Sequence, residues 1–205
     1  MPEPDPAKVK TFASAKTLRQ WLKANHASEN ELWIKVFKVK TGKPSVSWTE
    51  IVIETLCWGW IDGIKKSIDG EAYLQRITPR KPRSSWSKRN REHAERLIGE
   101  GRMQEPGLVQ VRAAKADGRW KNAYAPASEM KVPADFLAAV ERKPKAKQRF
   151  ETLNKGNRYA IAYGLTTAKR PETRQRRFDE FLDMLIRGEK PDFGLTKSKK
   201  TLAKP

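Results

Sequence analysis

Cysteine and histidine are scarce in this chain of 205 residues, which contains Cys57, His26 and His93 and no other residue of either type. A single cysteine cannot form an internal disulfide, and the usual zinc-ligand spacings are absent. The sequence also lacks an apolar run of about 18 residues, the length needed to cross a bilayer. Its start, MPEPDPAKVK, does not resemble a signal peptide. We therefore expect a cytoplasmic protein with no membrane span, no metal and no cofactor.

Acidic residues are also few, because 24 Asp and Glu stand against 43 Lys and Arg, giving a formal net charge of +19. Two segments carry most of this excess: residues 80–102 hold 8 basic and 3 acidic groups, and residues 141–205 hold 18 and 8. An excess of this size favours an anionic partner. Because 38% of the residues are apolar, the chain can still form a core.

The first third of the chain alternates between helix and strand signals. Ser14 can cap a helix over residues 15–25, and the apolar alternation in residues 31–39 predicts a strand. The motif SWTE at residues 47–50 is a capping box that begins another helix, which Gly59 can end.

Residues 61–77 predict two short strands joined at Asp69 and Gly70, a pair that suits a type I′ turn. With the strand at 31–39 they would make a small antiparallel sheet packed with helices, so the fold class is α+β. Further helices are expected from Ser87 to about Ile98 and from Pro106 to Gly118.

From residue 131 onward only helical patterns follow, over about 133–142, 145–154, 157–168 and 172–187. The predicted organisation is a flexible N-terminus (1–11), an α+β domain (12–128), a helical subdomain (131–188) and a basic flexible tail (189–205). Eleven apolar side chains of the helical subdomain should form one core: Phe136, Leu137, Val140, Phe150, Leu153, Ile161, Leu165, Phe178, Phe181, Leu182 and Leu185.

The segment TPRKPRSSWSKRN, residues 78–90, is the best candidate binding site. A helix that begins at Ser87 directs free N–H groups toward an anion, and arginine side chains can grip two oxygens at once. The candidate ligand-binding residues in this segment are Arg80, Arg83, Ser84, Trp86, Ser87 and Asn90. Equally open is a structural interpretation, in which Ser87 only caps the helix, Trp86 is core and the arginines pair with Asp62 or Glu95.

The motif GWIDG at residues 59–63 and the preceding Trp58 extend this candidate site. Trp58 and Asp62 can face a ligand, and the glycines allow a ligand or another backbone to approach closely. For Asp62 a role in ordering the turn, or a salt bridge to Arg80 or Arg83, is favoured over ligand binding.

Catalysis has little support in the sequence. Cys57 has apolar neighbours that predict a buried thiol, and His93 falls on a basic helix face without an orienting carboxylate. We therefore expect a non-catalytic binder of a small anionic ligand, with an enzyme of unknown reaction as the less favoured case. Nucleic-acid binding is the main alternative, since the segment RPETRQRRF at residues 170–178 is rich in arginine and Trp86 lies among basic residues.

Three stretches together resemble one family: GWIDG at 59–63, TPRKPRSSWSKRN at 78–90 with GRM at 101–103, and AKRPETRQRRF at 168–178 after YAIAYGL. The chain resembles the YdeI/OmpD-associated, or bacteriocin-protection, family over almost its whole length. That resemblance implies a bacterial source, a helical module at residues 131–188 and an N-terminal domain similar to the YjbR/CyaY fold. It implies a protective phenotype and an association with a porin, but no reaction.

Overall fold

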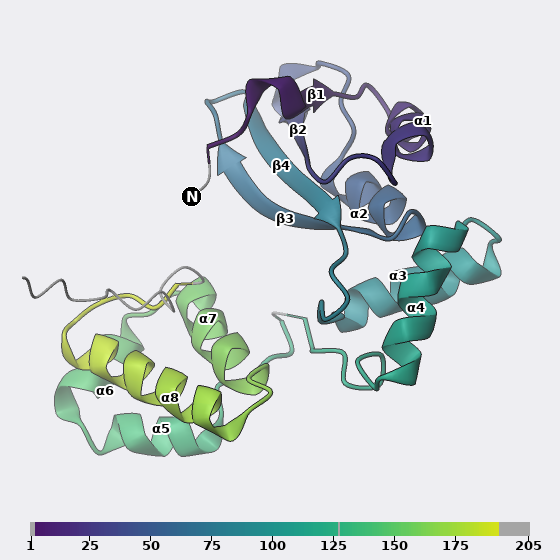
Figure 1. Ribbon diagram of the computed structural model, residues 1–205. Coiled ribbons are helices and arrows are strands. Elements are labelled where there is room, and N and C mark those ends of the chain that lie inside the picture. The colour runs from purple at the N-terminus through teal and green to yellow at the C-terminus, as the bar shows by residue number, and fades with distance from the viewer. Residues whose placement is uncertain (1–2, 127, 193–205) are drawn as a thin grey trace, which may run out of the picture. The chain divides into compact units, whose positions relative to one another are not determined.

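The computed structural model describes residues 3–126 and 128–192 (Figure 1). The chain divides into two compact units with the boundary between Tyr124 and Ala125, a few residues before the break expected near residue 128. Residues 193–205, most of the tail expected to be flexible, lie outside the described part of the chain.

A four-stranded sheet forms the N-terminal unit in the order β1-β2-β4-β3. Its strands are β1 (Val9–Thr11), β2 (Leu32–Phe37), β3 (Trp60–Ser67) and β4 (Ala72–Pro79). β1 runs parallel to β2, and the other pairs are antiparallel. Residues 9–11 were expected to be flexible, and this prediction is wrong because they pair with β2. Three residues are too few to show a strand alternation, so the pairing partner alone identifies β1.

The β3–β4 hairpin confirms two antiparallel strands around Asp69 and Gly70 but not the turn type. Among the described residues only five glycines have a positive φ, and Gly70 is not one of them, so the turn is not type I′. Instead, Asp69 Oδ1 accepts the N–H groups of Glu71 (2.7 Å) and Ala72 (2.8 Å). The carboxylate closes a longer loop, and these hydrogen bonds lower the pKa of Asp69.

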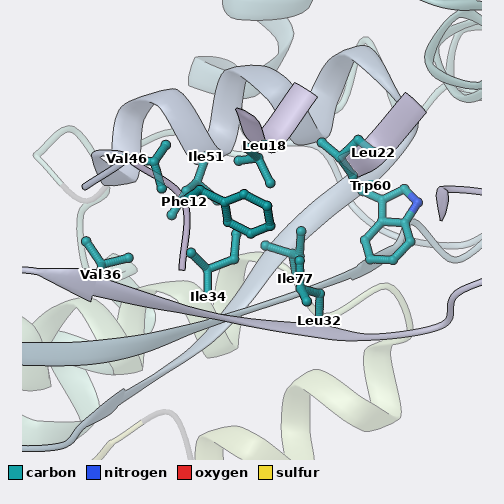
Figure 2. Packing of buried hydrophobic residues seen from close by; sticks show 10 residues of the cluster. All are labelled: Phe12, Leu18, Leu22, Leu32, Ile34, Val36, Val46, Ile51, Trp60 and Ile77. Atoms are coloured by element: carbon teal, nitrogen blue, oxygen red, sulfur yellow. The ribbon is translucent and has the colours of Figure 1, made fainter. Parts of the chain in front are cut away.

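Helices α1 (Ala15–Asn25) and α2 (Trp48–Cys57) cover one face of the sheet (Figures 1 and 2). Both begin with a capping box, made by Ser14 with Thr17 and by Ser47 with Glu50. Between these helices and the sheet lies the first core, which consists of Phe12, Leu18, Leu22, Leu32, Ile34, Val36, Val46, Ile51, Trp60 and Ile77. Short 3-10 helices, Pro6–Lys8 and Val39–Thr41, flank β1 and β2.

Helices α3 (Lys88–Gly99) and α4 (Glu105–Ala116) pack against α2 around a second core that includes Trp86, Leu97 and Trp120. The backbones of α4 and of the α2–β3 turn approach very closely. A Cβ added at Gly107 would lie 2.5 Å from the carbonyl oxygen of Cys57, and one at Gly59 would lie 2.6 Å from that of Pro106. Gly59 therefore allows another backbone to approach, which is one of the roles predicted for the glycines of GWIDG.

The C-terminal unit consists of α5 (Ala134–Glu141), α6 (Pro144–Glu151), α7 (Lys155–Thr166) and α8 (Pro171–Ile186) (Figure 1). The four predicted helices are thus confirmed, and ten of the eleven predicted core residues pack in or against one cluster. The exception is Leu137, which is 37% exposed because it falls on the outer face of α5. At Gly164 a Cβ would lie 2.7 Å from the Phe181 ring, so only glycine admits this contact between α7 and α8.

Candidate functional site

Arg80, the first residue of the predicted anion site, is buried within the N-terminal unit. Only 4% of the residue is exposed, and its guanidinium lies 4.0 Å from the centre of the Trp86 ring. Nη1 donates to the carbonyl oxygen of Ser85 (3.1 Å), while Nη2 is buried and has no hydrogen-bond partner among the described residues. Burial lowers the pKa of Arg80 to about 10, which leaves it charged at neutral pH. Arg80 therefore acts on the chain's own backbone and on Trp86.

Arg119, which was not predicted from the sequence, also binds the backbone of the loop before α3. Its Nη1 donates to the carbonyl oxygen of Ser84 (2.9 Å), and its Nε lies 2.7 Å from a carboxylate oxygen of Asp117. Two buried arginines thus hold adjacent carbonyl groups of the loop before α3. The contact of Arg119 with Ser84 joins residues that are 35 positions apart, so no local sequence pattern could have predicted it.

The N-terminus of α3 is largely occupied by the chain itself. Ser87 Oγ accepts the N–H of Asn90 (3.1 Å), as expected of a cap. The N–H of Lys88 donates to the carbonyl oxygen of Tyr124 (2.8 Å), whose own N–H donates to Trp86 (3.0 Å). Arg83 remains exposed on the loop surface. The structure therefore brings Arg80, Ser84, Trp86 and Ser87 together through backbone contacts and leaves Arg83 on the surface.

Trp86 is 2% exposed and meets the Trp120 ring edge to face at 4.8 Å, so it is a core residue. The carboxylate of Asp62 accepts a hydrogen bond from Trp48 Nε1 (3.1 Å) and forms no ion pair with a described arginine. Burial raises the pKa of Asp62. The hydrogen bond from Trp48 and the positive charges of Arg80 and Arg89 act in the opposite direction, but burial has the larger effect.

Trp58, the last of the predicted site residues, lines a different hollow, with a volume of about 240 Å³. The walls of this hollow come from α1, the end of α2 and the α3–α4 turn. The lining residues are Arg19, Glu54, Cys57, Trp58, Gly101, Arg102 and Gln104. Trp58 Nε1 is buried without a hydrogen-bond partner among the described residues, and its ring lies 4.7 Å from that of His26.

A buried carboxylate organises the charges of this cavity. Glu54 is 1% exposed, and Arg19 binds it with both Nε (2.9 Å) and Nη2 (2.7 Å). Arg102 Nη2 adds a third bond at 3.0 Å. Two arginines thus share one carboxylate, and about half of the Arg19 side chain and a third of Arg102 remain exposed. Arg102 also pairs with Glu100, because its Nη1 lies 3.6 Å from Glu100 Oε2. Two arginines and two carboxylates therefore meet at this wall, and Glu54 is the buried member of the group.

The sequence holds one signal that points to this cavity. Glu54 interrupts the apolar run IVIETLC of α2, and a carboxylate that is buried with such a run requires a cationic partner. Which arginines supply it could not be predicted, because Arg19 and Arg102 lie 35 and 48 residues away. The neighbouring thiol is not a nucleophile at neutral pH, since burial raises the pKa of Cys57 to about 11.

The arginines of α8 that suggested a nucleic-acid interface are engaged within the C-terminal unit. Arg174 pairs with Asp135 (2.7 Å), Arg176 pairs with Glu180 (2.7 Å), and Arg177 donates to the carbonyl oxygen of Gly164 (2.7 Å). The contacts of Arg174 and Arg177 attach α8 to α5 and α7, whereas the pair of Arg176 with Glu180 lies within α8. They leave fewer free guanidinium groups on this helix than the sequence suggests.

Within residues 3–126 and 128–192 no group of three His, Cys, Asp or Glu side chains is placed to hold a metal ion. No helix in that same part of the chain is both long enough and apolar enough to cross a bilayer. Burial and the positive charges of Arg89 and Arg96 lower the pKa of His93, which lies on the basic helix face expected from the sequence.

Comparison with known families divides the chain much as the structure does. Residues 10–110 match a family described as "Domain of unknown function (DUF8412)", and a YjbR/CyaY-like fold for this part stays a prediction. No curated protein and no solved structure matches the chain. Residues 129–188, which comprise α5 to α8, match the family described as "Bacteriocin-protection, YdeI or OmpD-Associated", so the resemblance to this family is supported by the helical C-terminal unit.

Proposed function

We propose that this protein is a non-catalytic binding protein of the bacteriocin-protection type. We propose further that it holds a small anionic ligand in the hollow lined by Arg19, Glu54 and Arg102, which is called the anion cavity from here on. The observation that carries the proposal is the pair of arginines that share the single buried carboxylate of Glu54. A cytoplasmic location and a bacterial source remain predictions of the sequence.

Hydrogen-bond capacity supports a ligand at this place. A guanidinium has five N–H donors, and Arg19 uses two groups and Arg102 one group on Glu54. The remaining donors border a hollow that also contains Trp58, whose Nε1 has no partner among the described residues. Arg102 Nη1 is already shared with Glu100 (3.6 Å). A carboxylate or phosphate group would accept hydrogen bonds from the donors that remain, and charge-assisted hydrogen bonds of this kind are the strong ones.

The size of the cavity restricts the ligand class. Its volume of about 240 Å³ corresponds to about eight water molecules at about 30 Å³ each. A small dicarboxylate or an inorganic anion fits this space, whereas a nucleotide is too large to enter it. Gln104 Nε2 donates to the carbonyl oxygen of Arg102 (3.0 Å), which helps to fix the wall before a ligand arrives.

Titration calorimetry on the full chain tests the proposal with succinate, citrate and inorganic phosphate as probes. Arg102→Gln should weaken binding of the preferred probe at least tenfold, while Glu54 keeps its two bonds to Arg19. Arg112→Gln is the matched control, because Arg112 is an exposed arginine that pairs with Glu105 outside the cavity. Glu54→Gln should tighten binding, since it removes the competing negative charge.

Arg102→Gln and Glu54→Gln should thus change the affinity in opposite directions. If the arginines and Glu54 formed only a structural ion pair, neither substitution would change the affinity for a probe in this way. No binding of any probe, or equal losses in Arg102→Gln and Arg112→Gln, would refute the proposal. The sequence predicts an anion site at residues 78–90 instead, where Arg83 is exposed. Loss of probe binding in Arg83→Gln but not in Arg102→Gln would place the site there.

A further inference from the structure

Two adjoining hollows lie on the surface of the C-terminal unit, with volumes of about 470 and 430 Å³. Both are lined by Lys145 and Ile186, so they form one continuous groove along the α5–α6 turn, α6 and the end of α8. The groove lining consists of Arg142, Lys143, Pro144, Lys145, Gln148, Arg149, Thr152, Leu185, Ile186, Arg187 and Gly188. It is independent of the anion cavity, because no residue is shared.

The rim of this groove is strongly basic. Five lining residues are Lys or Arg, and the lining contains no acidic residue. Glu189, just beyond the rim, pairs with Arg187 at 3.0 Å and neutralises that one charge. Arg142, Lys143 and Lys145 are exposed and carry no ion pair within the described residues. An occupant that carries several negative groups would match this charge.

The floor of the groove is apolar and restricts the occupant further. Pro144 is exposed on the surface, and Ile186 is partly buried against the core of the unit. An occupant therefore needs an apolar side chain as well as carboxylates. Single-stranded nucleic acid gains affinity from aromatic faces on which its bases stack, and the groove lining contains no aromatic side chain.

We propose that this groove docks an acidic, amphipathic segment of a partner protein, with an apolar side chain on Pro144 and Ile186 and carboxylates against Arg142, Lys143 and Lys145. This is the helix-in-groove mode of recognition, in which apolar residues at helical spacing supply affinity and charges supply specificity. The C-terminal unit is then the part of the chain that engages a protein partner.

Fluorescence anisotropy of a labelled 16-residue peptide tests this inference on the full chain at about 0.15 M salt. The peptide has leucine at every third or fourth position and glutamate elsewhere. The double variant Lys143→Glu/Lys145→Glu should weaken binding at least tenfold. The matched double variant Lys131→Glu/Lys169→Glu reverses two exposed lysines of the same unit that do not line the groove, and it should bind within twofold of the wild type.

Three further ligands complete the test. A peptide with serine in place of leucine should bind at least tenfold more weakly, because it cannot use the apolar floor. Equal loss in the two double variants, or equal binding of the serine peptide, overturns the proposal, since the charge then acts as a diffuse field. Tighter and groove-dependent binding of a 16-nucleotide single strand, or of vesicles of phosphatidylglycerol, overturns it in favour of that partner. Circular dichroism of each variant confirms that the fold is retained.

Discussion

Gly107→Ala should destabilise the N-terminal unit, although alanine is the better helix former. The added Cβ would lie 2.5 Å from the carbonyl oxygen of Cys57, 2.6 Å from that of Leu56 and 2.8 Å from Met103 Cε. Met103 can move, because it is the end of a flexible side chain. The two carbonyl groups belong to the end of α2 and cannot move without displacing that backbone, so α4 has to shift away from α2.

The magnitude follows from two opposing effects. Overpacking of a well-packed contact costs about 1–3 kcal/mol, and backbone obstacles place this case in the upper part of that range. Alanine recovers at most about 1 kcal/mol of helix propensity. The net loss in the free energy of unfolding should therefore be about 1–2 kcal/mol. A shift of α4 also strains the hydrogen bond from the Gln104 N–H to the carbonyl oxygen of Cys57 (3.1 Å), which borders the anion cavity.

Urea unfolding of the full chain, followed by tryptophan fluorescence, measures the effect. Gly99→Ala is the matched control, because Gly99 is also helical but has no described atom within 4 Å of an added Cβ. This control should be neutral or gain up to about 1 kcal/mol through the unfolded state. If Gly107→Ala proves as stable as Gly99→Ala, α4 and α2 do not approach as closely as described, and the reasoning fails.

Two further predictions concern the core residue Phe181 and the half-buried carboxylate of Asp62. Phe181, 3% exposed, fills the core of the C-terminal unit, so Phe181→Ala should cost about 3–5 kcal/mol; an unchanged urea midpoint would contradict that placement. Asp62→Asn should stabilise the protein at pH 7, because burial raises the pKa of this carboxyl and its ionised form then costs folding energy at any pH above the folded pKa. The gain should vanish once the pH falls below the unfolded pKa, since both states are then protonated, and a gain that persists at low pH would assign the effect to packing.

The sequence by itself determined most of the local structure. The helix starts at Ser14, Ser47 and Ser87 were predicted because a cap joins atoms only three residues apart, so residue types alone specify the hydrogen bond. The four C-terminal helices followed in the same way from proline positions and apolar spacing. The segment of β1 and the turn at Asp69 were described incorrectly, since the first depends on pairing with a distant strand and the second on a side chain that can close several turn types.

Only the tertiary structure decided where the charges meet. The sequence gives no reason for Arg19 to pair with Glu54 rather than with another acid, and the burial that makes this pair matter arises when α1, α2 and the α3–α4 turn pack together. In the same way Arg80 is held by the buried Trp86 ring and by the backbone carbonyl group of Ser85, although the sequence could equally assign this arginine to an anion. An arginine is long and exposes the same donors in either role, so its partner is fixed by which elements pack beside it and not by its neighbours in the chain.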